Sequence, residues 1–221
     1  MSADTMKIKL RALPSLKGPC VEMAISDLPG TPQDAFRSWL DDAIADGIKE
    51  PHAMTLSTVD ADGLPDARVL ILKNVDAKGW HFAIKANSPK GRQLASNPRA
   101  ALTFYWPALG RQVRLRGTAV PLSDAECADD FSSRPIGSKV SAIASKQSEV
   151  LDAPEDLEKS LNEAQDFLGK HPEHVEQGWR VFAVAPHVVE FWQGATDRQH
   201  KRLRYTSDEA GQAWKKEMLW P

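Results

Sequence analysis

The feature that most restricts the fold of this chain is a succession of short strand-like segments separated by tight turns. Residues 54–59, 67–73 and 80–84 are rich in apolar residues, and the turns 60–63 and 76–79 between them each end on glycine, which adopts positive φ without strain. Further strands are predicted at 100–106, 111–122, 180–185, 188–193, 202–205 and 214–219. Because the strands do not alternate with helices, the pattern predicts an α+β, mainly β class built on an antiparallel barrel.

Helices are expected around these strands, where apolar residues recur at helical spacing or helix-start signals occur. Their predicted ranges are 36–44, 89–96, 124–132, 138–144 and 154–168. Ser88 is a predicted N-cap, and Ser123 with Glu126 forms a predicted capping box. Residues 1–33 contain several prolines and glycines and are expected to be an irregular N-terminal arm, whereas 34–221 are expected to form a single domain.

The composition limits the kinds of partner. The chain has 221 residues and a formal net charge of −2, so no overall basic field favours nucleic acid or an anionic membrane, and neither is expected as a partner. Two cysteines, Cys20 and Cys127, are too few for a disulfide framework or a cysteine-rich zinc site. His171 and His174 resemble a metal pair but lack further spaced ligands, so no metal is expected. Without a long apolar run or a signal core, a cytoplasmic location is expected.

The segment 68–73 combines a strand that is apolar on both faces with a cation at each end. Such a strand is expected to be buried on both faces. Buried Arg68 and Lys73 would each need a paired anion, because an uncompensated charge inside a protein costs several kcal/mol. Two interpretations remain open. Either both cations reach water at the ends of the strand, or the phosphate of a ligand supplies the anion.

Two further segments suggest anion sites. Lys90 follows Ser88 and Pro89 at a predicted helix start, where free N–H groups and the helix dipole favour an anion. On its own this is an ordinary helix start. Arg134 and Ser138 lie near the junction of two predicted helices and could chelate a phosphate together. The alternative for Arg134 is a loop residue that caps helix carbonyls.

A row of polar residues follows a tryptophan near the C-terminus. If the chain is extended there, Arg198, His200 and Arg202 face the same way beside Trp192. A planar aromatic ligand that carries a phosphate would suit this combination of ring, cations and histidine donor. The alternative is a charged edge strand that prevents aggregation.

Seven collinear motifs resemble those of the pyridoxine/pyridoxamine 5′-phosphate oxidase family, in the family's order and spacing. They are RVLILK (68–73), SPKGRQL (88–94), NPRAAL (97–102), RQVRLRG (111–117), SRP (133–135), SKQS (145–148) and EFWQG (190–194). The resemblance covers nearly the whole chain from about residue 36. It implies an antiparallel Greek-key split β-barrel of the FMN-binding type with appended helices, and a homodimer with FMN at the subunit interface.

The resemblance also implies an activity and roles for residues. Pyridoxamine 5′-phosphate or pyridoxine 5′-phosphate would be oxidised to pyridoxal 5′-phosphate while O2 is reduced to H2O2, with Arg198 and His200 as catalytic residues that hold the pyridine ring over the flavin. The substrate would be bound by Lys73, Arg134, Ser138, Arg198 and His200. FMN would be bound by Arg68, Val69, Leu70, Ile71, Leu72, Lys73, Ala83, Ile84, Lys90, Gln112, Gln147, Ser148, Trp192 and Arg202.

Several positions depart from the family's pattern. Asp130 stands where the family usually places a tyrosine on the substrate phosphate, and a carboxylate repels a dianion unless it turns away or pairs with Arg134. The other departures are Ala83-Ile84 in place of a Tyr-Thr pair, Pro89 in place of a polar residue, and Lys201 in place of an aspartate. Two alternatives therefore stay open: a related flavin oxidoreductase acting on another substrate, such as a dihydro-aromatic compound, or a non-catalytic split barrel that binds flavin or haem.

Overall fold

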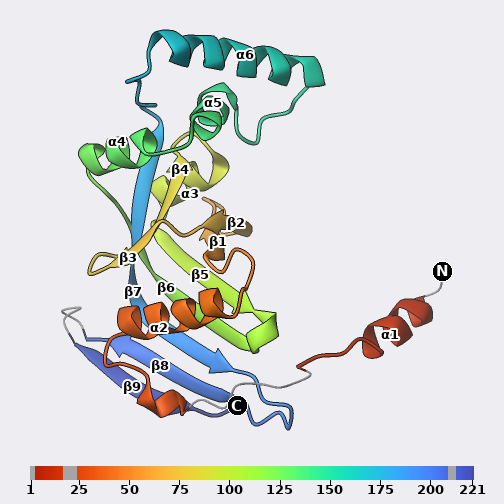
Figure 1. Ribbon diagram of the computed structural model, residues 1–221. Helices are drawn as coiled ribbons and strands as arrows, with labels where there is room; N and C mark the ends of the chain where they lie inside the picture. The colour runs from red at the N-terminus through yellow and green to blue at the C-terminus, as the bar shows by residue number, and fades with distance from the viewer. Residues whose placement is uncertain (1–2, 17–23, 209–212) are drawn as a thin grey trace. The chain divides into compact units, whose positions relative to one another are not determined.

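Figure 1 shows the computed structural model of the chain, which describes residues 3–16, 24–208 and 213–221. The chain forms two compact units, each assembled from separate segments. The first unit contains Met1–Pro51, Thr103–Arg114 and Val188–Pro221, and the second contains His52–Leu102 and Leu115–His187. Cys20 lies outside the described residues, whereas Cys127 is buried with a free thiol.

The strands of the described residues have three to eight residues, apart from two of 11 and 15 residues. They are β1 (Ala53–Val59), β2 (Pro65–Ile71), β3 (Asn74–Asp76), β4 (Gly79–Lys85), β5 (Arg99–Trp106), β6 (Arg111–Pro121), β7 (Trp179–Gln193), β8 (Lys201–Ser207) and β9 (Trp214–Leu219). They pair in the order β2-β1-β5-β6-β7-β4-β3, and β8 and β9 continue from β7. The fold is the antiparallel split barrel with appended helices that the sequence predicts.

In the second unit, β1 and β2 form a hairpin whose turn contains Gly63 at φ +83°. Alternate side chains of β1 are buried, as expected for a strand with one face on a core. The outer face of β2 is different, because Val69 is 67% exposed and Ile71 is 38% exposed. The expectation that 68–73 is buried on both faces is therefore wrong for this chain by itself, since no described part of it covers Val69 and Ile71.

Three helices of the second unit begin where predicted, and α5 begins two residues before the predicted Ser138. They are α3 (Pro89–Ser96), α4 (Asp124–Ser132), α5 (Ile136–Ala144) and α6 (Pro154–Lys170). The Ser88 hydroxyl accepts a hydrogen bond from the N–H of Gly91, and Ser123 with Glu126 forms the capping box. Figure 1 shows α5 and α6 side by side, and they pack through Val140, Ala164 and Leu168. A second apolar cluster joins α4, α5 and β7 through Phe131, Ala142 and Trp179.

The first unit packs α2 (Pro32–Ala45) against strand residues through aromatic side chains. The rings of Trp39 and Phe191 lie 5.1 Å apart, and those of Phe36 and Phe104 lie 4.7 Å apart. The remaining elements are α1 (Ala3–Arg11) and the short 3-10 turns η1 (Ile25–Asp27) and η2 (Pro107–Leu109). No helix among the described residues is both long and apolar enough to cross a membrane.

Four further features differ from the expectations. Residues 3–11 are helical although they lie in the segment expected to be irregular, and α2 begins at Pro32. β3 was not predicted, because three residues carry no periodic signal. The two strands expected on either side of Pro186 are one strand, β7. Gly117 of β6 approaches this proline so closely that a Cβ there would lie 2.0 Å from the Ala185 oxygen, and only glycine permits two backbones to lie so near each other.

Candidate active site

A cavity of about 350 Å³ lies in the second unit, against β2, the start of α3 and the segment that follows α5. Six residues predicted to bind the cofactor line it: Arg68, Val69, Leu70, Lys90, Gln147 and Ser148. Three segments that are far apart in the sequence thus contribute to one wall. That these six side chains bind FMN stays a prediction, and the geometry of each bears on it.

Arg68 is held in place by polar neighbours on three elements. Its Nη1 donates to the Thr58 hydroxyl at 2.6 Å, and its Nη2 pairs with the Asp66 carboxylate and donates to the Gln93 side-chain oxygen at 3.3 Å. The hydrogen bond from Gln93, together with the charge of Arg68, lowers the pKa of Asp66. The anion that the sequence required for Arg68 is therefore a carboxylate of the protein itself, and the guanidinium is fixed in one orientation.

Lys90 is the cation in this wall that most needs an anion. It is 7% exposed, and its ammonium donates to the Gln147 side-chain oxygen at 2.6 Å. Burial lowers the pKa of Lys90, and the nearby charge of Arg68 lowers it further. A buried ammonium that bonds a neutral amide, at a helix N-terminus and beside a second cation, matches what a phosphate group requires. The residues of this cavity therefore fit the phosphate of FMN.

The segment that contributes Gln147 and Ser148 is positioned by a lysine that the sequence reasoning did not select. Lys85, at the end of β4, is buried and donates to the carbonyl oxygens of Ala142 and Ser145 at 2.7 and 2.6 Å. These carbonyls lie at the C-terminal end of α5, where a cation is favourable. The signal that could have identified Lys85 is its place in an otherwise buried strand, because a buried lysine needs hydrogen-bond acceptors. Ser148 has φ +73°, a conformation that costs free energy and is frequent at functional sites.

A second group of polar and charged side chains, called here the Lys73 cluster, contains Lys73, Asp130, Arg134, Ser138 and Trp179. The Lys73 ammonium pairs with Asp130 at 3.1 Å, and the Trp179 indole N–H donates to the same carboxylate at 2.8 Å. The Arg134 guanidinium stacks 4.1 Å from the centre of the Trp179 ring and donates to the Ser138 carbonyl. Asp130 thus pairs with Lys73, whereas the sequence suggested Arg134 as its partner. Trp179 was missed, although a buried indole N–H needs an acceptor.

A third group lies in the first unit and is called here the C-terminal cluster: Glu190, Trp192, Arg198, His200 and Arg202. Trp192 and Arg202 are opposite each other across β7 and β8, and the ring of His200 lies 4.9 Å from that of Trp192. Glu190 accepts from Arg202 at 3.0 Å and also pairs with Arg114. Burial by itself would raise the pKa of Glu190, but the hydrogen bonds from the two arginines outweigh it and lower the pKa.

The predicted row of Arg198, His200 and Arg202 on one extended face is wrong. The N–H of Arg198 closes a turn on the Ala195 oxygen at 3.1 Å, and Arg198 has φ +68°. The His200 Nδ1 accepts from the Ala195 N–H at 3.1 Å. Only Arg202 lies in β8. Turn residues, and not strand alternation, therefore set where Arg198 and His200 lie.

The other predicted cofactor residues lie outside the cavity wall. Leu72 and Ile84 are buried and Ala83 packs against the cluster of Phe131, Ala142 and Trp179. Ile71 is partly exposed on β2, and Gln112 is half-buried on β6 in the first unit. Their roles toward FMN stay predictions.

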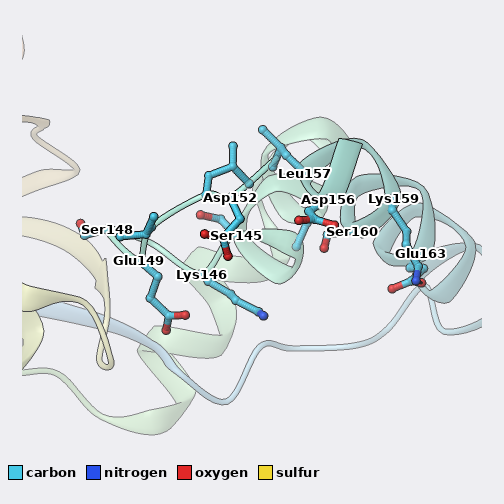
Figure 2. Close-up of a pocket in the computed structure, with 13 residues that line it drawn as sticks. Ser145, Lys146, Ser148, Glu149, Asp152, Asp156, Leu157, Lys159, Ser160 and Glu163 are labelled. Carbon is cyan, nitrogen blue, oxygen red and sulfur yellow. The ribbon is translucent and has the colours of Figure 1, made fainter. Parts of the chain in front are cut away.

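Figure 2 shows a second cavity of the second unit, of about 530 Å³, between the segment after α5 and the start of α6. Ser148 is the predicted site residue in its wall, which otherwise carries acidic and hydroxyl groups such as Asp152, Asp156 and Ser160. Lys159 lies 3.9 Å from Glu163 in the same wall. In the described part of the chain, no three His, Cys, Asp or Glu side chains are placed to hold a metal ion.

Comparisons with known proteins agree with this fold. The family model for pyridoxamine 5′-phosphate oxidase matches residues 40–193, and that for the pyridoxine 5′-phosphate oxidase C-terminal dimerisation region matches 179–221. The pyridoxine/pyridoxamine 5′-phosphate oxidase of Thermosynechococcus vestitus is 44% identical over 89% of this chain and 92% of its own length. The protein of the same name from Pseudomonas paraeruginosa is 41% identical over 89% and 91%.

A solved structure is also similar. PhzG from Burkholderia lata 383, in complex with tetrahydrophenazine-1-carboxylic acid, superposes with a TM-score of 0.84 at 30% identity, over 91% of this chain and 98% of its own. The split-barrel fold and the family match define an FMN-dependent oxidoreductase, with FMN as its cofactor. Within that class, the chain belongs to the pyridoxamine 5′-phosphate oxidase family. Its C-terminal region is the family's dimerisation region, which supports a homodimer.

Proposed function

We propose that this chain is an oxidase that converts pyridoxamine 5′-phosphate or pyridoxine 5′-phosphate to pyridoxal 5′-phosphate, with O2 reduced to H2O2. The observation that supports the proposal is that the two ends of the segment 68–73 belong to two separate groups of cations. Arg68 and Lys90 line the same cavity, whereas Lys73, five residues after Arg68, pairs with Asp130, whose charge also acts on Arg134. A cofactor phosphate and a substrate phosphate require two such groups, because each dianion needs its own donors.

The residues that would hold the cofactor fall into two sets. Arg68, Lys90 and the start of α3 would bind the FMN phosphate, and Gln147 and Ser148 would offer further polar contacts. Trp192 and Arg202 of the C-terminal cluster would complete the site at the subunit interface of the homodimer. When bound, FMN supplies the redox chemistry, because it accepts a hydride from the substrate and passes the electrons to O2.

The substrate would be positioned by the other two groups. Lys73, Arg134 and Ser138 would bind its phosphate, and Arg198 and His200 would orient its pyridine ring. The Nδ1 of His200 accepts a backbone hydrogen bond, so the proton of the neutral ring lies on Nε2. Nε2 is then a donor that can bond a ring substituent of the substrate. The protein thus holds the reacting carbon at a fixed place, which is its main contribution to a cofactor-dependent reaction.

A second candidate function keeps the chemistry and changes the substrate. Asp130 already occupies Lys73, which would favour a substrate without a dianionic phosphate. The relative solved with tetrahydrophenazine-1-carboxylic acid shows that the same fold accommodates a larger aromatic acid. A dihydro-aromatic compound is therefore the alternative substrate class.

Oxygen uptake by the FMN-loaded protein tests the proposal. Pyridoxamine 5′-phosphate and pyridoxine 5′-phosphate should each give saturable uptake with formation of pyridoxal 5′-phosphate, and added catalase should return part of the oxygen as H2O2 is consumed. The control is the protein without FMN. A yellow protein that consumes no oxygen with either compound would exclude both as substrates and favour the second candidate.

A further inference from the structure

Both carboxylate oxygens of Asp130 are engaged within the Lys73 cluster. Oδ1 lies 3.1 Å from the Lys73 ammonium, and Oδ2 accepts from the Trp179 indole at 2.8 Å. The side chain of Asp130 is 17% exposed and that of Lys73 is 32% exposed. The pair is thus partly withdrawn from water, where charges interact more strongly than on an open surface. Two bonds from different elements hold the carboxylate in one orientation.

The helix that carries Asp130 does not favour a carboxylate at this position. Asp130 lies in the last turn of α4, which contains no basic residue. The C-terminal end of a helix carries partial negative charge, so an acidic side chain there is unfavourable. A residue that is unfavourable for its own helix, but is compensated by surrounding groups, indicates a function. Lys73 and Arg134 are those compensating groups.

The charges of the cluster match a small negative charge on the ligand. Lys73 and Arg134 contribute two positive charges and Asp130 contributes one negative charge, so the three side chains together carry +1. The guanidinium Nε of Arg134 is buried and has no hydrogen-bond partner in the described residues. A dianionic phosphate would meet this single net charge with the Asp130 carboxylate already on one of its two cations. It would therefore gain less than at a site with two free cations.

We propose that Asp130 is a specificity-determining residue, because its carboxylate competes with the substrate's anchoring group for Lys73. The enzyme then discriminates weakly between phosphorylated substrates and planar substrates whose anchoring group carries one negative charge or none. This inference rests on the proposed function for the location of the substrate phosphate. It extends that function by defining the substrate class through charge.

Equilibrium binding of two inert pyridines to the FMN-loaded enzyme tests the proposal. 4-Deoxypyridoxine 5′-phosphate and 4-deoxypyridoxine lack the C4′ hydroxyl group, so they cannot be oxidised to the aldehyde, and a change in flavin absorbance reports their binding. The dissociation constant of 4-deoxypyridoxine divided by that of its 5′-phosphate measures how much the phosphate contributes to binding. Asp130→Asn should raise this ratio by about tenfold, equivalent to about 1.4 kcal/mol, because it removes the competing charge while its amide oxygen still accepts from Trp179.

Two further variants separate charge from packing. Asp129→Asn makes the same charge change at the exposed neighbouring position of α4 and should leave the ratio unchanged. Asp130→Ser removes the charge with a smaller side chain and should also raise the ratio. A merely structural role for Asp130 would weaken both pyridines equally in these variants.

The outcomes distinguish this inference from the proposed function. An unchanged ratio in both Asp130 variants, or binding of neither pyridine by any of the proteins, overturns the inference. Absence of oxygen uptake alongside a raised ratio overturns the oxidase function and leaves the role of Asp130 in place.

Discussion

At the scale of single residues, Lys90 has the clearest conflict between stability and function. Its ammonium is buried against a neutral amide, and burial lowers its pKa. Such a group costs free energy in the folded protein without its ligand. It becomes favourable when a phosphate lies beside it, because hydrogen bonds between charged groups are about twice as strong as neutral ones. In the proposed site, the side chain would therefore stabilise the complex with FMN at the expense of the free protein.

Lys90→Met should separate these two effects. The methionine keeps most of the apolar stem and removes the charge, so the cofactor-free protein should unfold at an equal or higher urea concentration. The dissociation constant of FMN should rise by about 10- to 100-fold. Fluorescence titration with FMN and urea unfolding of the cofactor-free protein measure the two quantities. The control Arg92→Met removes an exposed cation two residues later in α3. A variant that loses stability but keeps FMN affinity would contradict the role given to Lys90.

Sequence reasoning identified many cations of the candidate site but not their partners. Arg68, Lys73 and Lys90 were predicted because a charge beside apolar residues needs an explanation wherever the chain goes. The partner of Lys73 could not be predicted, because Asp130 is far away in the sequence and α4 brings it near only in the folded protein. The same reason hides Trp179 and Lys85, which act on residues of other elements.

At the scale of elements, the N-terminus of α4 makes the stability of the fold depend on acid. Glu126 completes the capping box with Ser123 and also pairs with Lys78. The hydrogen bond from Lys78, followed by those from Ser123, lowers the pKa of Glu126 from 4.5 to about 2. A carboxyl group with a lowered folded-state pKa stabilises the fold above its unfolded-state pKa. That stabilisation is lost as the pH falls from about 4.5 to about 2.

Glu126→Gln should remove this part of the pH dependence. The urea midpoint of the wild-type protein should fall more steeply than that of the variant across this pH window, because glutamine does not titrate. Near neutral pH the variant should be slightly less stable, since the amide weakens both contacts. Asp124→Asn, in the same first turn of α4, is the control and should keep the wild-type slope. Parallel curves for wild type and Glu126→Gln would show that the capping box does not link α4 to pH.

Elements were easier to predict than their exposure. Ser88, Ser123 and the glycine turns located α3, α4 and the hairpin of β1 and β2 because these signals are local. β7 continues through Pro186, where it lies against Gly117 of another strand, and no local pattern contains that contact. The prediction that β2 is buried on both faces failed for a related reason. Apolar residues indicate that a face will be covered, but they do not indicate which chain covers it.

At the scale of the whole molecule, the outer face of β2 connects the cofactor cavity to assembly. Val69 lines the cavity and is 67% exposed in the single chain, and Ile71 continues the same apolar face. Apolar side chains beside a cofactor site favour burial by a partner surface. The family's dimerisation region in residues 179–221 supports a homodimer. The second subunit is the partner that would cover this face, in agreement with the proposed location of FMN at the subunit interface.

Val69→Glu should therefore weaken dimerisation and cofactor binding together. A carboxylate on this face would be buried without a cation on formation of the dimer, and the dimer dissociation constant should rise by about tenfold or more. Light scattering across a dilution series measures the mass, and flavin fluorescence measures FMN release at the same concentrations. In the wild-type protein FMN should be released over the same range of protein concentration in which the dimer dissociates.

Val120→Glu places the same charge on an exposed position of β6 and serves as the control. If Val69→Glu released FMN from an intact dimer, the face would belong to the cofactor site alone, whereas an unchanged mass and FMN affinity would leave β2 open to solvent in the assembled enzyme.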